Sequence, residues 1–192
     1  NVLLNVVPQY NLMNVINKKR TMKEIILASK SHRRKELMET LGLPFSVMAS
    51  HTREDWNPLL TAKENSLNIA KEKAQAIFLE KPEAVIIASD TIVLKNDFVF
   101  GKPKDVKEAR KMIEELSDSI HQVYTSIVVR EGNRILSDIS VSDVYFLPIP
   151  REDLEVYLQG SEWKDKAGAY AIQGWAARYI DKIDGDYYAI MG

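Results

Sequence analysis

Apolar residues follow two kinds of pattern that alternate along this chain. Residues 25–28, 45–49 and 84–88 form short apolar runs of strand length, and the third run is continuously apolar, which is typical of a strand buried on both faces. Residues 37–41 and 67–77 instead place apolar side chains three and four positions apart, at helical spacing. This alternation predicts an α/β domain.

Other segments have the pattern of antiparallel hairpins. Residues 92–94 and 98–100 flank a polar tripeptide that favours a turn, and residues 123–130 and 134–146 flank Glu131-Gly132-Asn133. Antiparallel strands added to the alternating strands and helices predict a mixed sheet. The expected fold class is therefore α/β, with a mixed central sheet flanked by helices.

The residues at the ends of the periodic segments predict where helices begin and end. The long helix over residues 67–77 can begin at Asn57-Pro58, or at Thr61, where Glu64 would complete a capping box. Lys81-Pro82 ends it. The remaining predicted elements are a helix from Asp105 to about Ser117, a helix from Pro150 to Leu158, and strands at residues 175–180 and 186–190.

Composition narrows the possible functions. The 192 residues include 26 basic and 27 acidic side chains, which fits one domain and gives no sign of a nucleic-acid-binding surface. The absence of cysteine excludes disulfides, zinc–thiolate sites and thiol catalysis. His32, His51 and His121 lack the spacing of metal ligands, and we expect each at the surface or at a cap. No apolar run has the length of a membrane span, so we expect a cytoplasmic protein that does not bind membranes.

The first residues differ in composition from the rest. Residues 1–17 are rich in Asn, Val and Leu and are followed by the basic run Lys18-Lys19-Arg20, the reverse of the order in a secretory signal. We interpret residues 1–21 as an N-terminal extension, either disordered or the product of an upstream start. Residues 22–192 are then expected to form a single catalytic domain.

The segment from residue 24 to residue 34 is the strongest candidate for a binding site. An apolar run ends at Ser29, and Ser31 and the pair Arg33-Arg34 follow at the start of a helical pattern. Hydroxyls and free backbone N–H groups at a helix N-terminus favour an anion, and guanidinium groups match phosphate oxygens. A capped surface helix with solvated arginines fits this segment, taken alone, equally well.

Two further motifs carry charged side chains. Asp90 ends the buried run in Ser89-Asp90-Thr91, where a carboxylate can face a ligand at the carboxyl end of a strand, although it could equally cap a turn. Lys102 lies in Gly101-Lys102-Pro103, a stiff turn that would hold a lysine in a defined place. An isolated motif of this kind more often carries a solvated lysine.

The segment from Asp165 to Gly174 is rich in small residues around a few polar ones. Lys166, Tyr170 and Gln173 are the side chains that could orient a ligand against a closely packed backbone. Gln173 can both donate and accept hydrogen bonds, as recognition of a base edge requires. An ordinary loop amide explains Gln173 equally well.

Taken together, these motifs resemble the Maf family of nucleoside triphosphate pyrophosphatases. The matching segments occur in the family's order and cover residues 22–192; they are Leu27-Ala28-Ser29-Lys30-Ser31-His32-Arg33-Arg34, Ser89-Asp90-Thr91, Gly101-Lys102-Pro103, Asp165-Lys166-Ala167-Gly168-Ala169-Tyr170 and Ile183-Asp184-Gly185-Asp186-Tyr187. The resemblance implies a Maf/inosine-triphosphatase-like fold with two lobes around a nucleotide cleft. It also implies hydrolysis of a nucleoside triphosphate to the monophosphate and pyrophosphate.

The resemblance assigns roles to individual residues. Asp90 matches the catalytic aspartate that activates water. The expected substrate-binding residues are those of the phosphate loop, three lysines and the positions that vary with base preference: Ser29, Arg33, Arg34, Lys73, Lys102, Lys166, Thr91 and Gln173. Arg33, Thr91 and Gln173 resemble the branch of the family that acts on dTTP, UTP and related or modified pyrimidine nucleotides.

The chain departs from the family pattern in three places. His32 replaces a usual proline, and an expected acidic pair is replaced by Arg53-Glu54-Asp55. Glu54 or Asp55 is therefore expected to join Asp90 in binding Mg²⁺ or Mn²⁺, which prefer oxygen ligands. The chain also ends at Gly192, where the family continues into a further helix, so we expect that C-terminal helix to be absent.

The resemblance leaves the partners and one functional alternative open. Family members are commonly dimers, which implies a homodimer here. The alternative function is a non-catalytic nucleotide-binding regulator of cell division, for which the same phosphate loop would serve. A pure sensor has no need of Asp90 facing the phosphates, and that carboxylate distinguishes the two hypotheses.

Overall fold

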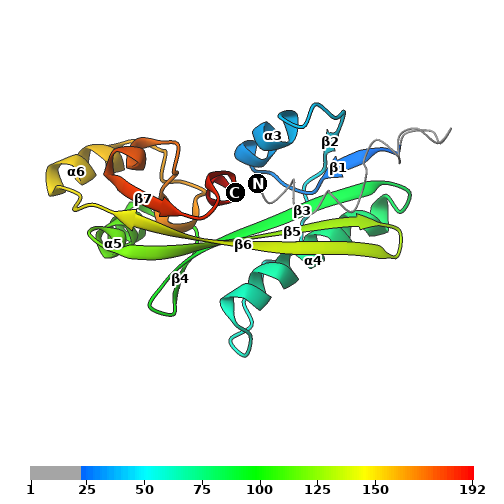
Figure 1. Cartoon of the computed structure of the whole chain (residues 1–192), viewed down its shortest axis with the longest axis horizontal. Coiled ribbons are helices and arrows are strands. Elements are labelled where there is room, and N and C mark those ends of the chain that lie inside the picture. Colours follow the sequence, from blue (N-terminus) through cyan, green and yellow to red (C-terminus); the bar gives the residue numbers. More distant parts are fainter. Residues whose placement is uncertain (1–22) are drawn as a thin grey trace. The chain divides into compact units, whose positions relative to one another are not determined.

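The computed structural model describes residues 23–192 and shows strands and helices in alternation (Figure 1). The expectation for residues 1–21 lies outside the described residues. The strands are β1 Ile25–Leu27, β2 Ser46–Val47, β3 Val85–Lys95, β4 Phe98–Phe100, β5 Ile120–Glu131, β6 Arg134–Phe146 and β7 Ile180–Asp184. The α-helices are α3 His32–Glu39, α4 Ala62–Glu80, α5 Val106–Leu116, α6 Arg151–Gln159 and α7 Tyr187–Met191, and the 3₁₀ helices are η1 Ala167–Ala169 and η2 Trp175–Tyr179.

The strands form one mixed sheet, as predicted. Their order is β2-β1-β3-β5-β6-β7, with β4 paired to β3. Strand β1 pairs in parallel with β2 and with β3, where Ile26 lies opposite Ile86. The pairs β3–β4 and β6–β7 are antiparallel. The predicted α/β class, with a mixed sheet flanked by helices, is confirmed.

The described chain divides into two compact units. Unit 1 comprises residues 23–90 and 125–139 together with Gly192, and unit 2 comprises residues 91–124 and 140–191. Each unit has a hydrophobic core of its own. None of the helices in residues 23–192 is long and apolar enough to cross a membrane.

Unit 1 is built around two crossovers between parallel strands. The chain runs from β1 through α3 to β2, and then back through α4 to β3 on the other side of β1. Because parallel crossovers are right-handed, these opposite directions place α3 and α4 on opposite faces of the strands (Figure 1). The core contains small and aliphatic side chains of β1, α4, β3 and β5, namely Ile26, Ala28, Ala70, Ala74, Ile77, Ala84, Ile86, Ala88 and Val128.

The start of α4 decides between the two predicted alternatives. Thr61 is the N-cap, and its side chain accepts a hydrogen bond from the backbone N–H of Glu64 while the Glu64 carboxylate accepts from the backbone N–H of Thr61. This is the predicted capping box. Asn57 does not begin the helix; its backbone N–H donates to Asn65 Oδ1 at 2.8 Å.

Unit 2 has a core rich in aromatic side chains. Helix α5 packs against α6 and η1. The large buried aromatic residues of this core are Phe100, Phe146, Tyr157, Trp163 and Tyr170. Gly168, at φ 67°, has the left-handed conformation that glycine favours, and a side chain here would meet Val93 and Leu116 at 3.2–3.4 Å. The glycine in the small-residue segment is therefore required by packing.

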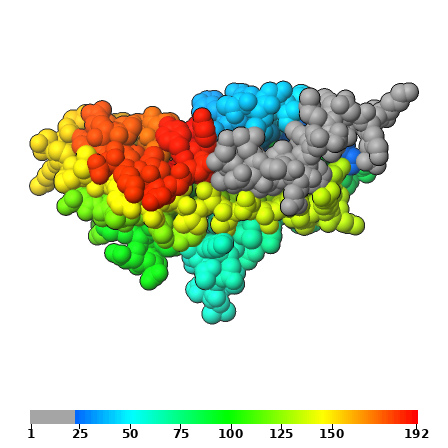
Figure 2. Space-filling view, viewed as in Figure 1, coloured from blue at the N-terminus to red at the C-terminus, as the bar shows by residue number. Residues whose placement is uncertain are grey.

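Two predicted strands near the end of the chain are wrong. Residues 175–179 form the 3₁₀ helix η2, and residues 187–191 form α7, with β7 between them. Gly185, at φ 140°, ends β7, and the Asp186 carboxylate accepts a hydrogen bond from the backbone N–H of Ala189, which starts the helix. Tyrosines and an isoleucine gave this stretch the composition of a strand. Figure 2 shows the red C-terminal segment at the surface, where Tyr187 and Tyr188 are exposed.

The prediction that all three histidines lie at the surface or at a cap is wrong for His121. Its side chain is 1% exposed, on the face of β5 that also buries Val123. Its Nε2 lies 2.7 Å from the hydroxyl of Tyr170, and its ring packs edge-on against Phe146. Sequence spacing cannot show this burial, because the partners come from β6 and from the loop after η1.

Candidate functional site

The loop after β1 has the predicted geometry, a strand that enters a helix through two serines. Ser31 is the N-cap of α3, and its hydroxyl accepts a hydrogen bond from the backbone N–H of Arg34 at 3.4 Å. Ser29 Oγ accepts from the backbone N–H of Ser31 at 3.1 Å. His32, the departure from the family pattern, is the first residue of α3 and forms an exposed pair with Glu36. The replacement therefore leaves the helix start intact.

Arg34 joins this loop to the strand that carries Asp90. Its Nη1 donates to the backbone carbonyl of Ser89 at 2.8 Å and to Ser29 Oγ at 3.4 Å. Burial lowers the pKa of the Arg34 guanidinium from its ordinary value, while the Asp90 carboxylate acts in the opposite direction. The alternative of solvated arginines is therefore wrong for Arg34, whose side chain is directed into unit 1.

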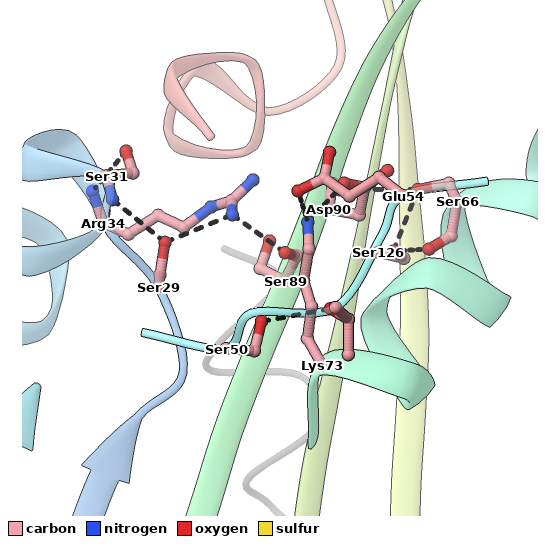
Figure 3. A network of polar contacts seen from close by, with 11 residues as sticks. Ser29, Ser31, Arg34, Ser50, Glu54, Ser66, Lys73, Ser89, Asp90 and Ser126 are labelled. Atoms are coloured by element: carbon pink, nitrogen blue, oxygen red, sulfur yellow. Dashed lines mark hydrogen bonds and ion pairs between the residues drawn. The ribbon is translucent and has the colours of Figure 1, made fainter. Parts of the chain in front are cut away.

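Asp90 lies within a buried ion-pair cluster. Lys73, on the inner face of α4, places its Nζ 2.8 Å from Asp90 Oδ1 and 2.9 Å from Glu54 Oε1 (Figure 3). The Lys73 and Asp90 side chains are each 7% exposed, whereas that of Glu54, in the loop before α4, is 43% exposed. One buried lysine thus pairs with two carboxylates that are far apart in sequence.

The position of Asp90 within its strand differs from the prediction. Strand β3 does not end near Asp90 but continues to Lys95, because residues 92–94 extend the same strand. Asp90 therefore does not cap a turn. Its carboxylate leaves the middle of a long strand.

Two polar atoms at this point of β3 are buried without a hydrogen-bond partner among residues 23–192. They are Asp90 Oδ2 and Ser89 Oγ. Buried polar atoms in native proteins are nearly always paired, so an unpaired carboxylate oxygen in a buried cluster indicates a place for a ligand, an ion or a water molecule. Ser89 belongs to a predicted motif but is not among the predicted site residues.

The acids near Asp90 are compatible with a divalent metal that also binds phosphate. Within residues 23–192, no three His, Cys, Asp or Glu side chains gather into a complete metal site. Magnesium, however, usually binds one or two carboxylates and takes its other ligands from phosphates and water. Asp90 Oδ2 and Glu54 suit that arrangement. Asp55 instead pairs with Arg53 at 2.8 Å, and both side chains are exposed.

The structure brings together part of the predicted set. Unit 1 contains seven of the predicted site residues: Ser29, Arg33, Arg34, Glu54, Asp55, Lys73 and Asp90. Unit 2 contains the other four, Thr91, Lys102, Lys166 and Gln173. Lys102 and Gln173 are exposed, Thr91 is half-buried, and Lys166 Nζ donates to the backbone carbonyl of Glu162. Ser66 and Ser126, which bond to each other behind Lys73 and Asp90, are not among the predicted site residues. Ser66 precedes Lys73 by seven residues, so helical spacing could have placed both on one face.

Comparison with known proteins identifies relatives along most of the chain. A family profile described as Maf-like protein matches residues 24–192. The chain is 42% identical over 170 residues to a dTTP/UTP pyrophosphatase of Bacillus velezensis, covering 88% of this chain and 90% of that protein. It is 40% identical over 171 residues to a dTTP/UTP pyrophosphatase of Pyrococcus furiosus, covering 89% of this chain and 90% of that protein.

Among solved structures, a HAM1 protein from Coxiella burnetii is similar with a TM-score of 0.47 and 20% identity, covering 68% of this chain and 76% of that chain. The match to the family profile extends from β1 to the last residue and therefore includes the phosphate loop, Lys73 and Asp90. The predicted resemblance is confirmed: the chain belongs to the Maf family.

Proposed function

We propose that this protein is a nucleoside triphosphate pyrophosphatase that acts on dTTP, UTP and related or modified pyrimidine nucleotides. The observation that carries the proposal is the asymmetry of the Asp90 carboxylate. Lys73 holds Oδ1 at 2.8 Å, while Oδ2 is buried and has no partner among residues 23–192. The substrate class follows the dTTP/UTP pyrophosphatases to which the chain is similar.

The triphosphate is expected at the loop between β1 and α3. Ser29, Arg33 and Arg34 would bind its oxygens, and the N-terminus of α3 adds backbone N–H groups and the positive end of the helix dipole. The hydrogen bond from Arg34 to the Ser89 carbonyl fixes the guanidinium before substrate arrives. Such a fixed cation stabilises charge without reorganising during the reaction.

Glu54, with Asp55 as the alternative, would bind a divalent metal directly, and Asp90 would bind it through a water molecule, which leaves Oδ2 free to accept a proton. The exposed pair between Asp55 and Arg53 favours Glu54, which already lies against Lys73. Bound Mg²⁺ or Mn²⁺ would neutralise phosphate charge and favour ionisation of a water molecule. Lys73, buried between the two acids, keeps both carboxylates in place.

The chemical step assigned to Asp90 is general-base catalysis. Oδ2 accepts a proton from the attacking water, whose oxygen forms a bond to the α-phosphorus. The bond between the α-phosphorus and the bridging oxygen breaks, and pyrophosphate leaves with that electron pair. Arg33 and Arg34 stabilise the negative charge that moves onto the phosphate oxygens.

The remaining predicted residues complete the proposal. Lys102 and Lys166 are proposed to bind the triphosphate, and Thr91 and Gln173, with Arg33, to set base preference, because they match the family's positions. A homodimer and a cytoplasmic location belong to the same proposal. The regulator hypothesis is less favoured, since a nucleotide sensor has no use for a buried carboxylate with one oxygen unpaired.

A panel of nucleoside triphosphates tests the proposal. Purified protein is incubated with dTTP, UTP, CTP, dATP, dGTP and methylated pyrimidine nucleotides, in Mg²⁺ and separately in Mn²⁺, and pyrophosphate and orthophosphate release are measured. Pyrophosphate release from dTTP and UTP above all others is expected. Nucleotide binding without release of either product would instead support the regulator, and orthophosphate release would move the cleavage to the β–γ bond.

A further inference from the structure

Two serine hydroxyls form a buried pair behind the ion-pair cluster. Ser66 lies on α4 and Ser126 on β5, and both are 0% exposed (Figure 3). Their Oγ atoms are 2.9 Å apart, and Ser126 Oγ also donates to the backbone carbonyl of Ser66 at 2.9 Å. This hydroxyl pair, Ser66 and Ser126, belongs entirely to unit 1.

Ser66 also contacts the residue that carries the proposed base. Its Oγ donates to the backbone carbonyl of Asp90 at 3.4 Å. Among residues 23–192, the Ser126 hydroxyl bonds to Ser66 and not to Asp90. The two hydroxyls are therefore chemically alike and equally buried, but only that of Ser66 donates to Asp90.

Helix α4 holds Asp90 at two points. Ser66 and Lys73 are seven residues apart, two helical turns, so both side chains lie on the same face of the helix. Lys73 bonds the carboxylate and Ser66 bonds the main-chain carbonyl of the same residue. The carboxylate and the main-chain carbonyl of Asp90 are therefore both held, and together these two contacts fix the direction in which the Asp90 side chain leaves β3. A contact to the carboxylate alone would not fix that direction.

The two hydroxyls have two protons to donate but take part in three hydrogen-bonding contacts. Two O–H groups serve three contacts: Ser66 to Asp90, Ser126 to Ser66 carbonyl, and the contact between the two Oγ atoms. Each hydroxyl donates one hydrogen bond at a time. Either hydroxyl can donate in the contact between the two Oγ atoms. When Ser126 donates, Ser66 keeps its proton for the Asp90 carbonyl, and when Ser66 donates, that carbonyl loses the hydrogen bond.

We propose that Ser66 is a positioning residue for Asp90, and that Ser126, equally buried beside it, is not required for this anchor. The inference rests on the proposed function, because it takes Asp90 as the general base. Ser66 acts by holding the Asp90 backbone so that Oδ2 keeps its direction while Lys73 holds Oδ1.

The matched variants Ser66→Ala and Ser126→Ala test the proposal. Each removes one buried hydroxyl from the same pair, so both should lower the melting temperature by similar amounts. Ser66→Ala removes the anchor, and kcat for dTTP should fall about tenfold with KM within about twofold, the size expected for one hydrogen bond that orients a reacting group. Ser126→Ala leaves the hydrogen bond from Ser66 to the Asp90 carbonyl in place, so kcat should stay within about twofold of wild type.

A measurement that needs no activity accompanies the kinetics. Amide hydrogen exchange of a peptide covering residues 86–92 should be faster in Ser66→Ala than in Ser126→Ala. Ser66→Thr, which keeps a hydroxyl, should restore slow exchange and most of kcat. Equal kcat losses and equal exchange in the two alanine variants would overturn the inference. If the wild-type protein releases no pyrophosphate, the proposed function fails, and hydrogen exchange alone still decides whether Ser66 anchors Asp90.

Discussion

The two units bury different kinds of side chain. Among residues 23–192, unit 1 buries nine polar or charged residues, namely Ser29, Asn65, Ser66, Lys73, Ser89, Asp90, Thr125, Ser126 and Arg130, whereas unit 2 buries His121 and Ser142. Unit 1 has a core of small and aliphatic residues, and unit 2 has a core rich in aromatic ones. Because buried polar groups are costly unless paired, so many in one unit indicate a role beyond stability.

The hydrogen bonds and ion pairs made by the buried polar side chains also differ between the two units. In unit 1 Lys73 and Ser66 both bond to Asp90, whose second carboxylate oxygen is buried without a partner in the described chain, as is His121 Nδ1 in unit 2. In unit 2 His121 pairs with Tyr170 and is enclosed by Phe146, whose ring centroid lies 4.9 Å from each of the other two. We interpret the first arrangement as a reactive site and the second as a structural pair. The predictions below test that interpretation.

The largest effect is expected at the centre of unit 1. Asp90→Asn removes the proposed base and should lower pyrophosphate release from dTTP at least ~100-fold, the low end of a general-base contribution. Asp138→Asn, an exposed change in the same unit, should keep activity within about twofold. Near-wild-type turnover in Asp90→Asn, with a matching circular dichroism spectrum, would remove Asp90 from the role.

Unit 2 should respond to pH through its buried histidine. Burial, and to a smaller extent the positive charge of Lys95, lowers the pKa of His121 from 6.5 to about 3. Between these values the unfolded chain binds a proton that the folded chain excludes, so stability falls as pH falls. Unfolding by urea should show a loss of about 2 kcal/mol from pH 7 to pH 5 from this residue alone.

A second histidine provides the control for that measurement. His32 is exposed, with a side chain that is 81% accessible. His32→Gln should therefore leave the slope of stability against pH unchanged. If His121→Gln has the same slope as the wild-type protein, His121 is not the group responsible, and the proton uptake on unfolding belongs to another residue.

A smaller loss of stability is expected at the partner of His121. Tyr170→Phe deletes the hydroxyl 2.7 Å from His121 Nε2 and leaves this second ring nitrogen unpaired beside the buried Nδ1, which should cost about 1–2 kcal/mol. Tyr124→Phe deletes a half-buried hydroxyl that donates to Gln122 and should cost less. Pyrophosphate release by Tyr170→Phe at temperatures well below its melting point should equal that of wild type; a specific loss of kcat would contradict a purely structural role.

Local patterns were sufficient to predict the parts of the site that are close in sequence. The strand, loop and helix around Ser29 and Arg34, and the capping box at Thr61, depend on contacts within a few residues. The class of the fold and the mixed sheet followed from the alternation of strand and helix patterns. These features are fixed by backbone geometry and side-chain periodicity.

Contacts between distant segments could not be predicted in the same way. Nothing in the sequence shows that Lys73 lies between Glu54 and Asp90, that Ser66 meets Ser126, or that His121 is buried. Each depends on how α4 and β5 pack on the sheet. Helix α7 was not predicted for a different reason. Tyr187, Tyr188 and Ile190 favour strands, and only the cap at Asp186 reverses that preference.

The smallest effect is expected at Gln173, which tests whether function is confined to unit 1. This residue lies in unit 2, is exposed, and directly precedes the turn into η2, where the Glu162 carboxylate accepts a hydrogen bond from the backbone N–H of Trp175 at 2.9 Å. An amide side chain, which both donates and accepts hydrogen bonds, suits recognition of a base edge when the turn that carries it is held in place.

Gln173→Ala should lower the preference for dTTP over CTP about five- to tenfold in kcat/KM, the range for losing one or two hydrogen bonds, with a smaller change in kcat. Gln159→Ala, a surface change on α6 of the same unit, should alter neither. An unchanged ranking of substrates in Gln173→Ala would remove Gln173 from base selection, whereas a blurred ranking with near-normal turnover would show that Gln173 contributes to selection and not to the chemical step.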